Sequence, residues 1–409
     1  MTLNEICELI VDCPHSTAKD EGSGYPLIRT PNIGRGRLIL DDVHRVSKEV
    51  YDKRNARAVP QDDDLILARE APAGNVAIIK KGEKVCLGQR TVLIRPDKRK
   101  VDPDYLAYYI LAPQQQYGLL GTANGATVAH VNIPVIKSLS VELPDIETQK
   151  RAAGVLKTYD DLIENTQKQL NLLEEMALRI YKEWIIDLHF PGHEDMEIVD
   201  GVPKKWKRVC VNDCLSFHMN GGWGKETAVG KNIYPGRVIR GTDINNIKGG
   251  EFSEVPLRYH NDNDIKKRVL KEGDIVFELS NGNINNIGRS LIIDEFILNK
   301  CGENTICASF CKFFRPVNRA CGLMLYWEIQ EMQTSGRMLP FKKQGANGIN
   351  NFAYDDFLNH ALLIPDSEEV FSCFESIMTK MSNCQRQLAV VIEARDRLLP
   401  KLMSGEIEL

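Results

Sequence analysis

Two long stretches with heptad patterning constrain the fold of this 409-residue chain more than any other feature. Within residues 145–187, mostly apolar side chains recur at alternating spacings of four and three residues, with no intervening proline. This spacing is the seam of a coiled-coil helix, for which Asp145 is the expected N-cap. The predicted packing positions are Leu156, Tyr159, Ile163, Leu170, Leu173, Ile180 and Trp184.

A second seam of the same kind occupies much of residues 366–409. Arg395 interrupts it, which favours a frayed or partner-facing end, and Pro400 is expected to end the helix. Each seam needs an apolar partner, and a folded segment separates the two helices, so we expect them to pair antiparallel with each other. The predicted packing positions are Phe374, Ile377, Met381, Leu388, Val391 and Leu398.

The segments that precede the two helices repeat one another weakly but in the same order, which indicates an internal duplication of one domain plus one helix. The offsets drift as loop insertions would make them drift. The matched segments are 25–29 with 234–240, 64–67 with 274–277, 88–91 with 302–305, 94–96 with 314–316, and 132–133 with 351–352.

Each repeated segment shows short apolar runs separated by turns and interrupted by short helical patterns, which is typical of a mixed α/β domain. The predicted fold class is therefore α+β, with two mixed α/β domains, each followed by a long helix, and the helices paired as an antiparallel coiled coil. The predicted boundaries are 1–144 and 188–365 for the domains, 145–187 for the first helix, and 366–409 for the second helix and tail.

The net charge of −4 argues against a protein that coats nucleic acid by basicity alone. Residues 145–187 carry 6 Lys/Arg against 9 Asp/Glu, and residues 367–409 carry 5 against 7, so the domains are nearly neutral. Contacts with DNA phosphates depend on local patches of positive charge rather than on the net charge, so the net charge does not exclude DNA binding. Without an apolar run of about 18 residues or a secretory leader, and with eleven cysteines expected as reduced thiols, a cytoplasmic location is expected.

Catalytic motifs are weak. The sequence has no Asx-Pro-Pro-aromatic tetrapeptide of amino-methyltransferases, no Gly-rich cofactor loop after a strand and no P-loop lysine pattern. The cysteines lack zinc-site spacing, and Cys307 and Cys311 are expected as buried thiols on one face of a strand over 305–313. We therefore expect no catalytic residue and no metal or cofactor site in this chain.

Several motifs in combination resemble those of the specificity subunits of type I restriction–modification systems. Each is modest alone, but together they extend over the whole chain. They are REAPAGNVA at 69–77, VCLGQR at 85–90, MALRIYKEWIID at 176–187, FAYDDFL at 352–358 and RLLPKLMSGEI at 397–407.

The resemblance implies that each domain is a target recognition domain for one half of a bipartite DNA site, and that the helix pair spaces the domains. It implies a non-catalytic chain that directs adenine-N6 methylation and ATP-dependent restriction by partner subunits. The implied partners are double-stranded DNA, two methyltransferase (modification) subunits and restriction/translocase subunits. S-adenosylmethionine, ATP and magnesium are expected on those partners.

Direct base readout needs polar or cationic side chains on loops that face a DNA groove. Given the resemblance, the candidates in the first half are Arg29, Asn32, Arg35, Arg37, Arg69, Gln89, Arg90, Asn124, Thr127 and His130. Those in the second half are Arg240, Asn245, Lys248, Asn281, Asn283, Asn285, Arg289, Lys342, Lys343, Asn347 and Asn350. The loops at 69–77 and 278–289 differ, as two domains that bind different sequences require, and no counterpart of Arg69 is assigned.

The sequence argues against two alternative functions and leaves a third open. A self-contained restriction–methylation enzyme would need catalytic motifs that the chain lacks. A coiled-coil assembly scaffold gives no reason for Arg- and Asn-rich loops that differ between the halves. A specificity subunit of an orphan or related two-subunit methyltransferase system would differ in its neighbouring genes.

Overall fold

The computed structural model describes residues 1–121, 130–345 and 348–409. The chain forms two compact units, one of Met1–Leu162 with Glu393–Leu409 and one of Ile163–Ile392. We call these unit 1 and unit 2, and their strand-containing parts, β1 to α4 and β9 to β22, the first and second domains. In the described part, none of the helices is both long and apolar enough to cross a membrane.

The first domain contains a five-stranded sheet of order β1-β8-β5-β6-β3 and a three-stranded sheet of order β4-β2-β7. The central strand β5 is buried along its whole length. The strands are β1 (Cys7–Asp12), β2 (Tyr25–Ile28), β3 (Gly36–Arg37), β4 (Arg45–Val46), β5 (Leu65–Ala68), β6 (Val76–Ile78), β7 (Cys86–Leu87) and β8 (Thr91–Pro96). The helices are α1 (Lys48–Arg54), α2 (Pro103–Leu111), α3 (Pro113–Leu120) and α4 (Ile133–Ser138).

The second domain contains a four-stranded sheet of order β12-β19-β15-β17 and three-stranded sheets of order β14-β13-β18 and β16-β21-β20. The pairs β10-β9 and β11-β22 are separate. The strands are β9 (Ile198–Val199), β10 (Val202–Pro203), β11 (Lys207–Cys210), β12 (Leu215–Asn220), β13 (Tyr234–Ile239), β14 (Leu257–His260), β15 (Ile275–Glu278), β16 (Ser280–Asn281), β17 (Ser290–Ile292), β18 (Ile306–Cys307), β19 (Cys311–Pro316), β20 (Lys342–Lys343), β21 (Asn350–Phe352) and β22 (Ala361–Ile364). The helices are α6 (Asp243–Lys248), α7 (Asp262–Arg268), α8 (Glu295–Cys301), α9 (Arg319–Ser335) and α10 (Tyr354–Leu358).

The duplication inferred from sequence is present in the hydrogen-bond pattern. The order β12-β19-β15-β17 repeats β1-β8-β5-β6, and β14-β13-β18 repeats β4-β2-β7 with the same antiparallel and parallel pairings. Arg95 pairs with Asp64 at 2.7 Å, and Arg315 pairs with Asp274 at 2.7 Å. The two domains therefore share one backbone frame and one buried ion pair.

One of the sequence equivalences is wrong, because matched residue types fell in the wrong register. The amide of Gly88 donates to Ile28 O, whereas the amide of Ala308 donates to Ile239 O, so Gly88 corresponds to Ala308. Segment 88–91 therefore matches 308–311 and not 302–305. The predicted strand over 305–313 is also wrong, because β18 and β19 are separate strands in different sheets, although Cys307 and Cys311 are buried.

A second equivalence shifts by two residues. Val131 donates its amide to Arg69 O, and Phe352 donates its amide to Leu279 O. Val131 therefore corresponds to Phe352, and α4 and α10 each begin two residues later, at Ile133 and Tyr354. The same bonds assign Leu279 as the counterpart of Arg69.

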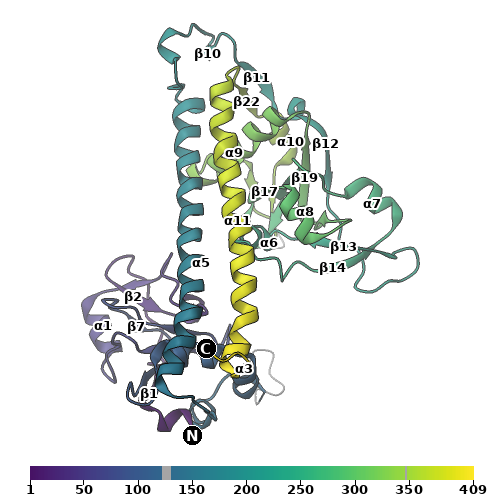
Figure 1. Ribbon diagram of the computed structural model, residues 1–409. Helices are drawn as coiled ribbons and strands as arrows, with labels where there is room; N and C mark the ends of the chain where they lie inside the picture. The colour runs from purple at the N-terminus through teal and green to yellow at the C-terminus, as the bar shows by residue number, and fades with distance from the viewer. Residues whose placement is uncertain (122–129, 346–347) are drawn as a thin grey trace. The chain divides into compact units, whose positions relative to one another are not determined.

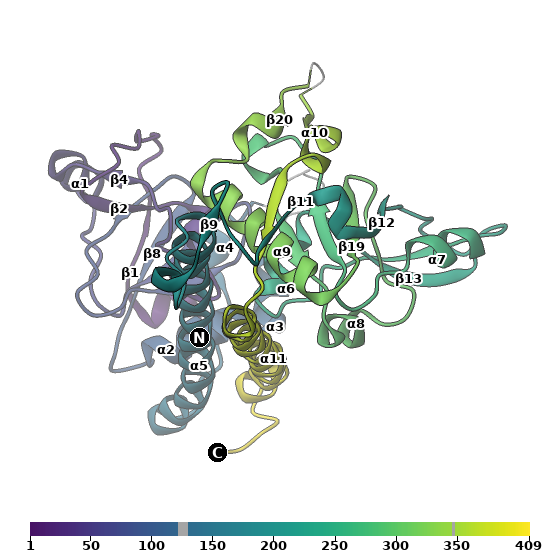
Figure 2. The ribbon, with the colours of Figure 1, turned by 90° about the horizontal axis from the view of Figure 1, so that it is seen from above.

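The long helices are α5 (Ile146–Tyr181), which continues as a π-helical turn over Lys182–Ile186, and α11 (Glu368–Met403). In unit 1, Asp160 near the start of α5 pairs with Arg395 near the end of α11 at 2.9 Å. In unit 2, the rings of Tyr181 and Phe374 lie 6.0 Å apart, so the end of α5 meets the start of α11. The helices are therefore antiparallel (Figures 1 and 2), and the α+β fold class with a paired coiled coil is confirmed.

The seam follows the heptad prediction up to Ala177 and then departs from it. Beyond Ala177 the buried positions are Tyr181 and Ile185, at steps of four, while Ile180 and Trp184 are only half-buried. The π-helical turn accompanies this shift, and the Tyr181 hydroxyl donates to Glu328 of α9 at 2.9 Å. Of the other predicted positions, Tyr159, Leu173 and Leu398 are half-buried, and Leu156, Ile163, Leu170, Phe374, Ile377, Met381, Leu388 and Val391 are buried.

The expectation that Pro400 ends α11 is wrong, and of the two expectations for Arg395 the frayed end is excluded. Arg395 is not at a frayed end, because its guanidinium pairs with Asp160, whose other carboxylate oxygen accepts from the Tyr108 hydroxyl at 2.7 Å. A paired polar residue within an apolar seam specifies which residues face each other. Pro400 does not end the helix, which continues to Met403, because the hydrogen bond that proline cannot donate is lost only in the last turn.

Candidate nucleic-acid interface

The most informative surface is one edge of the main sheet, which the duplication places in both domains. At this edge β1 and β5 end and β8 begins, and β12, β15 and β19 do the same in the second domain. Edge 1 is defined by Asp12, Arg69, Glu70, Arg90 and His130. Edge 2 is defined by the equivalent residues Asn220, Leu279, Ser280, Phe310 and Asn351.

The same backbone bond closes both edges. Arg69 donates its amide to Arg90 O at 2.8 Å, and Leu279 donates its amide to Phe310 O at 2.9 Å. Because the backbones match, the side chains at equivalent positions occupy equivalent places. Any difference in chemistry between the edges therefore comes from side chains and loop length.

Edge 1 is a chain of charged side chains. Arg69 is 8% exposed, and its Nη1 contacts both Asp12 carboxylate oxygens at 3.0 Å. Its Nη2 lies 2.8 Å from His130 Nε2, which must accept because a guanidinium only donates. His130 Nδ1 then donates to Glu70 at 2.5 Å, and Glu70 holds Arg90 at 2.9 Å.

The outer end of this chain is available for recognition. The Arg90 side chain is 60% exposed and has one nitrogen engaged with Glu70. A guanidinium oriented in this way can donate two hydrogen bonds to guanine O6 and N7 or bind a phosphate. Arg69 is buried and is connected to Arg90 through His130 and Glu70.

Edge 2 carries no charged side chain among its five residues. Phe310 is 60% exposed in the place of Arg90, and Ser280 Oγ donates to Asn351 Oδ1 at 2.7 Å. An exposed phenyl ring beside amide and hydroxyl groups is suited to the thymine methyl group and to adenine, rather than to guanine through a guanidinium.

The loop beside edge 2 is longer than its counterpart. Gly74 donates to Ala68 O and Gly288 donates to Glu278 O, both with φ near 90°, so residues 279–287 occupy the place of residues 69–73. The inserted residues pair in part as β16 with β21. Asn281 Oδ1 accepts from the amide of Asn283 at 2.7 Å, and this bond shapes the turn.

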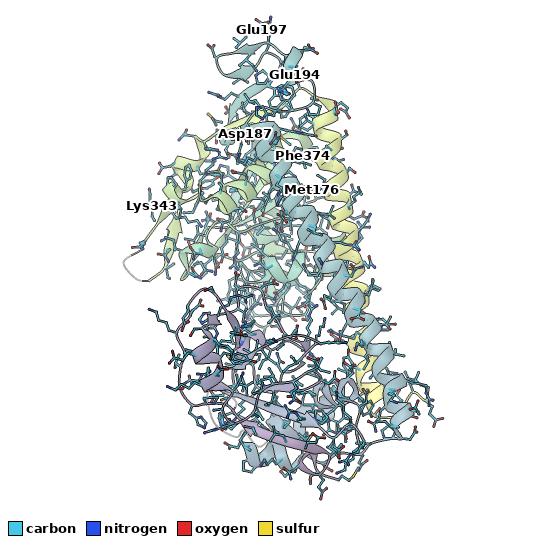
Figure 3. All side chains as sticks on the ribbon, turned by 90° about the vertical axis from the view of Figure 1, so that its left-hand side faces the viewer. Met176, Asp187, Glu194, Glu197, Lys343 and Phe374 are labelled. Carbon is cyan, nitrogen blue, oxygen red and sulfur yellow. The ribbon has the colours of Figure 1, made fainter. Side chains whose placement is uncertain are left out.

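The structure leaves some of the sequence candidates exposed. Lys343, which pairs with Asp356 at 3.2 Å, lies at the outer margin of unit 2, away from Met176 of α5 and Phe374 of α11 (Figure 3). Arg29, Arg37, Gln89, His130 and Lys342 are half-buried, and burial lowers the pKa of Lys342. The exposed candidates are Arg35, Arg90, Asn245, Asn283, Asn285 and Lys343.

Asn32 and Arg69 are only 5% and 8% exposed, so in this structure they have less access to a base than the exposed candidates. Asn32 accepts from the amide of Arg29 and donates to Ile39 O, which holds the loop after β2.

Lys248, another of the DNA-contact candidates, is engaged within the protein. Its ammonium lies 3.1 Å from Glu174 of α5 and from Gln330 of α9, so it joins the domain to the helix. Burial alone would lower the pKa of Lys248, but Tyr326 and Glu174 raise it above its ordinary value.

Further candidates are engaged within the second domain. Arg240 pairs with Asp243 at 2.6 Å, and Arg289 pairs with Glu278 at 2.8 Å. Asn281 donates to Glu278, and Asn350 donates to Gly282 O, so both shape the loop. Asn124, Thr127 and Asn347 lie outside the described residues.

Sequence reasoning missed Glu70, Ser280, Phe310 and Asn351. The wrong match of 88–91 with 302–305 concealed Phe310, and only the β-sheet register reveals that it occupies the place of Arg90. Within the part of the chain that the structure describes, there is no group of three or more His, Cys, Asp and Glu side chains arranged to hold a metal ion.

Comparison with known proteins identifies the family. A family model described as the type I restriction modification DNA specificity domain matches residues 1–175. The MjaIX specificity subunit of a type I restriction enzyme from Methanocaldococcus jannaschii is 24% identical over 413 residues, which cover 97% of this chain and 87% of that protein. This chain is therefore similar to type I restriction specificity subunits over nearly its whole length.

Other relatives agree with this assignment. The EcoBI specificity subunit of Escherichia coli is 27% identical over 173 residues, covering 42% of this chain and 35% of that protein. The S subunit of a type I restriction–modification system from M. genitalium has the same fold, with a TM-score of 0.53, 13% identity and coverage of 98% of this chain and 95% of that one. The family model and the named relatives together support a DNA sequence-specificity subunit, and the M. genitalium structure shows the likeness of fold.

Proposed function

We propose that each domain of this specificity subunit binds one half of a bipartite DNA site, with edge 1 contacting one half and edge 2 the other. The observation that carries the proposal is that one backbone frame presents two unrelated sets of side chains at the same edge. A scaffold has no use for such a difference, whereas two domains that recognise different bases require it.

The chemistry of the edges suggests how their base preferences differ. Arg90 at edge 1 is suited to a bidentate contact with guanine. Phe310 and Asn351 at edge 2 are suited to A·T pairs, because a phenyl ring packs on the thymine methyl group and an amide pairs with adenine N6 and N7. The exposed Asn283 and Asn285 extend this neutral surface.

The partners follow from the family. We assign two methyltransferase subunits, which bind S-adenosylmethionine and methylate adenine N6, and restriction/translocase subunits, which use ATP and magnesium. The specificity subunit contributes DNA binding and no cofactor. A cytoplasmic location is consistent with this role and with eleven cysteines that form no disulfide in the described residues.

The proposal is tested by co-expressing the chain with a methyltransferase subunit and mapping N6-methyladenine across a genome. We expect two short defined blocks of bases separated by a fixed gap. Arg90→Ala should change one block and Phe310→Ala should change the other. Arg99→Ala is the matched control, because Arg99 is an exposed arginine beyond the opposite end of β8 from Arg90. A competent complex that methylates without any sequence preference would exclude the proposed function.

A further inference from the structure

Three positions that are aliphatic in the first domain are polar in the second. The sheet register and the starts of α4 and α10 define the equivalences. In the first domain these residues belong to the apolar core or pack against it. The three pairs are Ile10 with His218, Val92 with Lys312, and Ile133 with Tyr354.

The three polar side chains form one cluster. Lys312 Nζ lies 3.7 Å from the centre of the Tyr354 ring, and the His218 ring lies 5.3 Å from the same ring. Phe314 stacks on Tyr354 at 5.9 Å with an angle of 15° between the rings, which fixes its orientation. The residues come from β12, β19 and α10, which lie near one another in unit 2 (Figure 1).

The cluster has unused hydrogen-bonding capacity. Tyr354 Oη and His218 Nδ1 are buried and have no hydrogen-bond partner among the described residues. Burial lowers the pKa of Lys312 and of His218, so the protein itself does not compensate the cost of a positive charge here. The Asp355 carboxylate raises both pKa values by its charge, but no direct bond from it to either side chain is present in the described part of the chain.

These groups match an anion better than any other ligand. A lysine ammonium and a tyrosine hydroxyl can donate, and a histidine can donate or accept. Buried polar atoms without partners destabilise a folded domain, and a phosphate oxygen would supply the missing acceptors. The equivalent place in the first domain is filled with aliphatic side chains and offers no such donors.

The position of the cluster indicates which anion. Lys312 pairs in the sheet with Asn220 of edge 2 and is two residues from Phe310. An anion bound there would lie directly beside the surface that faces the bases. In a DNA complex the phosphate that flanks the contacted bases is the anion at that place.

We propose that His218, Lys312 and Tyr354 form a phosphate-binding subsite of the second domain, which holds one backbone phosphate of the duplex bound at edge 2. The inference rests on the proposed function. It assigns to the second domain a backbone contact that the first domain lacks at the same place.

The test uses the specificity subunit in complex with its methyltransferase subunits and a duplex that carries the mapped motif. Lys312→Val places the first-domain residue at this position, and Lys267→Gln on α7 is an exposed lysine control. Lys312→Val is expected to weaken binding about tenfold and to reduce the slope of log K against log salt by about 1. The methylated motif should stay the same, because a phosphate contact carries no base information.

A neutral methylphosphonate placed at successive positions of the duplex locates the phosphate. At one position, the neutral substitution should weaken binding by the wild-type complex and leave binding by the Lys312→Val complex unchanged. Tyr354→Phe should show a smaller loss at that position. Thermal unfolding separates binding from folding, because Lys312→Val should fold at least as stably as wild type.

Three negative outcomes have different meanings. If the wild-type complex shows a motif and Lys312→Val keeps its affinity and salt slope, the subsite is wrong and the proposed function stands. If Lys312→Val changes the recognised bases, the residue contacts bases and the phosphate assignment is wrong. If the wild-type complex has no sequence preference, the proposed function itself fails.

Discussion

The first and second domains share strand order, register and a buried Arg–Asp pair, yet they differ in almost every side chain that packs on the inner face of the main sheet. Leu67, Ile94, Val131 and Ile136 of the first domain are replaced by Phe277, Phe314, Phe352 and Phe357 of the second. The phenyl rings contact one another at centroid distances of 4.8–6.2 Å. One frame thus accommodates an aliphatic core and an aromatic core.

The edges differ in the same way. Arg90 and Phe310 have equivalent backbones and opposite chemistry, while Arg95 and Arg315 make the same ion pair. Backbone hydrogen bonds and the buried ion pair hold the topology, so the core and the edge can vary independently of it. Because of this separation, a duplicated domain can change the side chains at its edge, and with them its proposed base preference, without losing its fold.

The largest expected effect comes from the aromatic core. Phe357→Ala should destabilise the second domain by about 4 kcal/mol, because it removes a fully buried ring with several ring contacts. Ile136→Ala should cost the first domain about 3 kcal/mol. Hydrogen exchange across a urea series resolves the two domains, and the exposed Val317→Ala is the control. Equal losses at both positions would show that the aromatic core adds no stability.

The shared ion pair should give equal effects in the two domains. Arg95→Ala and Arg315→Ala each leave an aspartate that is 2% or 1% exposed without its charged partner, and each should cost about 3 kcal/mol. Arg319→Ala removes an exposed pair with Glu375 and should cost less than about 1 kcal/mol. The same urea series measures all three. Losses that differ by more than about 2 kcal/mol between the domains would break the equivalence of the frames.

The two ends of the helix pair offer a third comparison, because the seam in unit 1 contains Asp160 and Arg395 where the seam in unit 2 has aromatic rings. Asp160→Leu should destabilise unit 1 by about 2 kcal/mol, because Arg395 and the Tyr108 hydroxyl lose their acceptor. The double variant with Arg395→Leu should recover most of that loss. A double-mutant cycle from urea unfolding measures the coupling, and additive losses would argue against it.

The smallest expected effect concerns pH. His260 pairs with Tyr234 between β14 and β13, is 1% exposed, and has its pKa lowered by burial. The unfolded chain binds a proton as pH falls through about 6.5, whereas folded His260 does not, so stability declines below that pH. His260→Val should be more stable than wild type, and by a larger margin at pH 5.5 than at pH 7.5. Unfolding at both pH values tests this, and a margin independent of pH would contradict it.

Local patterns carried most of the architecture. The heptads place the long helices within a few residues, with Asp145 accepting from the amide of Thr148 as the expected N-cap. The antiparallel pairing followed because each seam needs an apolar partner. The duplication was detectable because strands and turns recur in the same order in both halves, including the turns that contain Asp64 and Asp274.

The contacts of individual side chains could not be predicted from local sequence patterns. Arg69, Arg240 and Lys248 have the residue type and the loop position of DNA contacts, but each is held by protein carboxylates or amides. Composition cannot distinguish an arginine that faces a groove from one that holds a loop. That difference depends on which strands bring a carboxylate within hydrogen-bonding distance of the guanidinium.

The sequence by itself determined the fold class, the paired helices, the duplication and the resemblance to one family, because these depend on periodicity, order and motifs along the chain. Only the tertiary structure decided that Phe310 stands where Arg90 stands, that Leu279 stands where Arg69 stands, and that His218, Lys312 and Tyr354 meet. Cross-strand hydrogen bonds set these relations between residues that are far apart in sequence, and a shift of register by one residue would change every one of them.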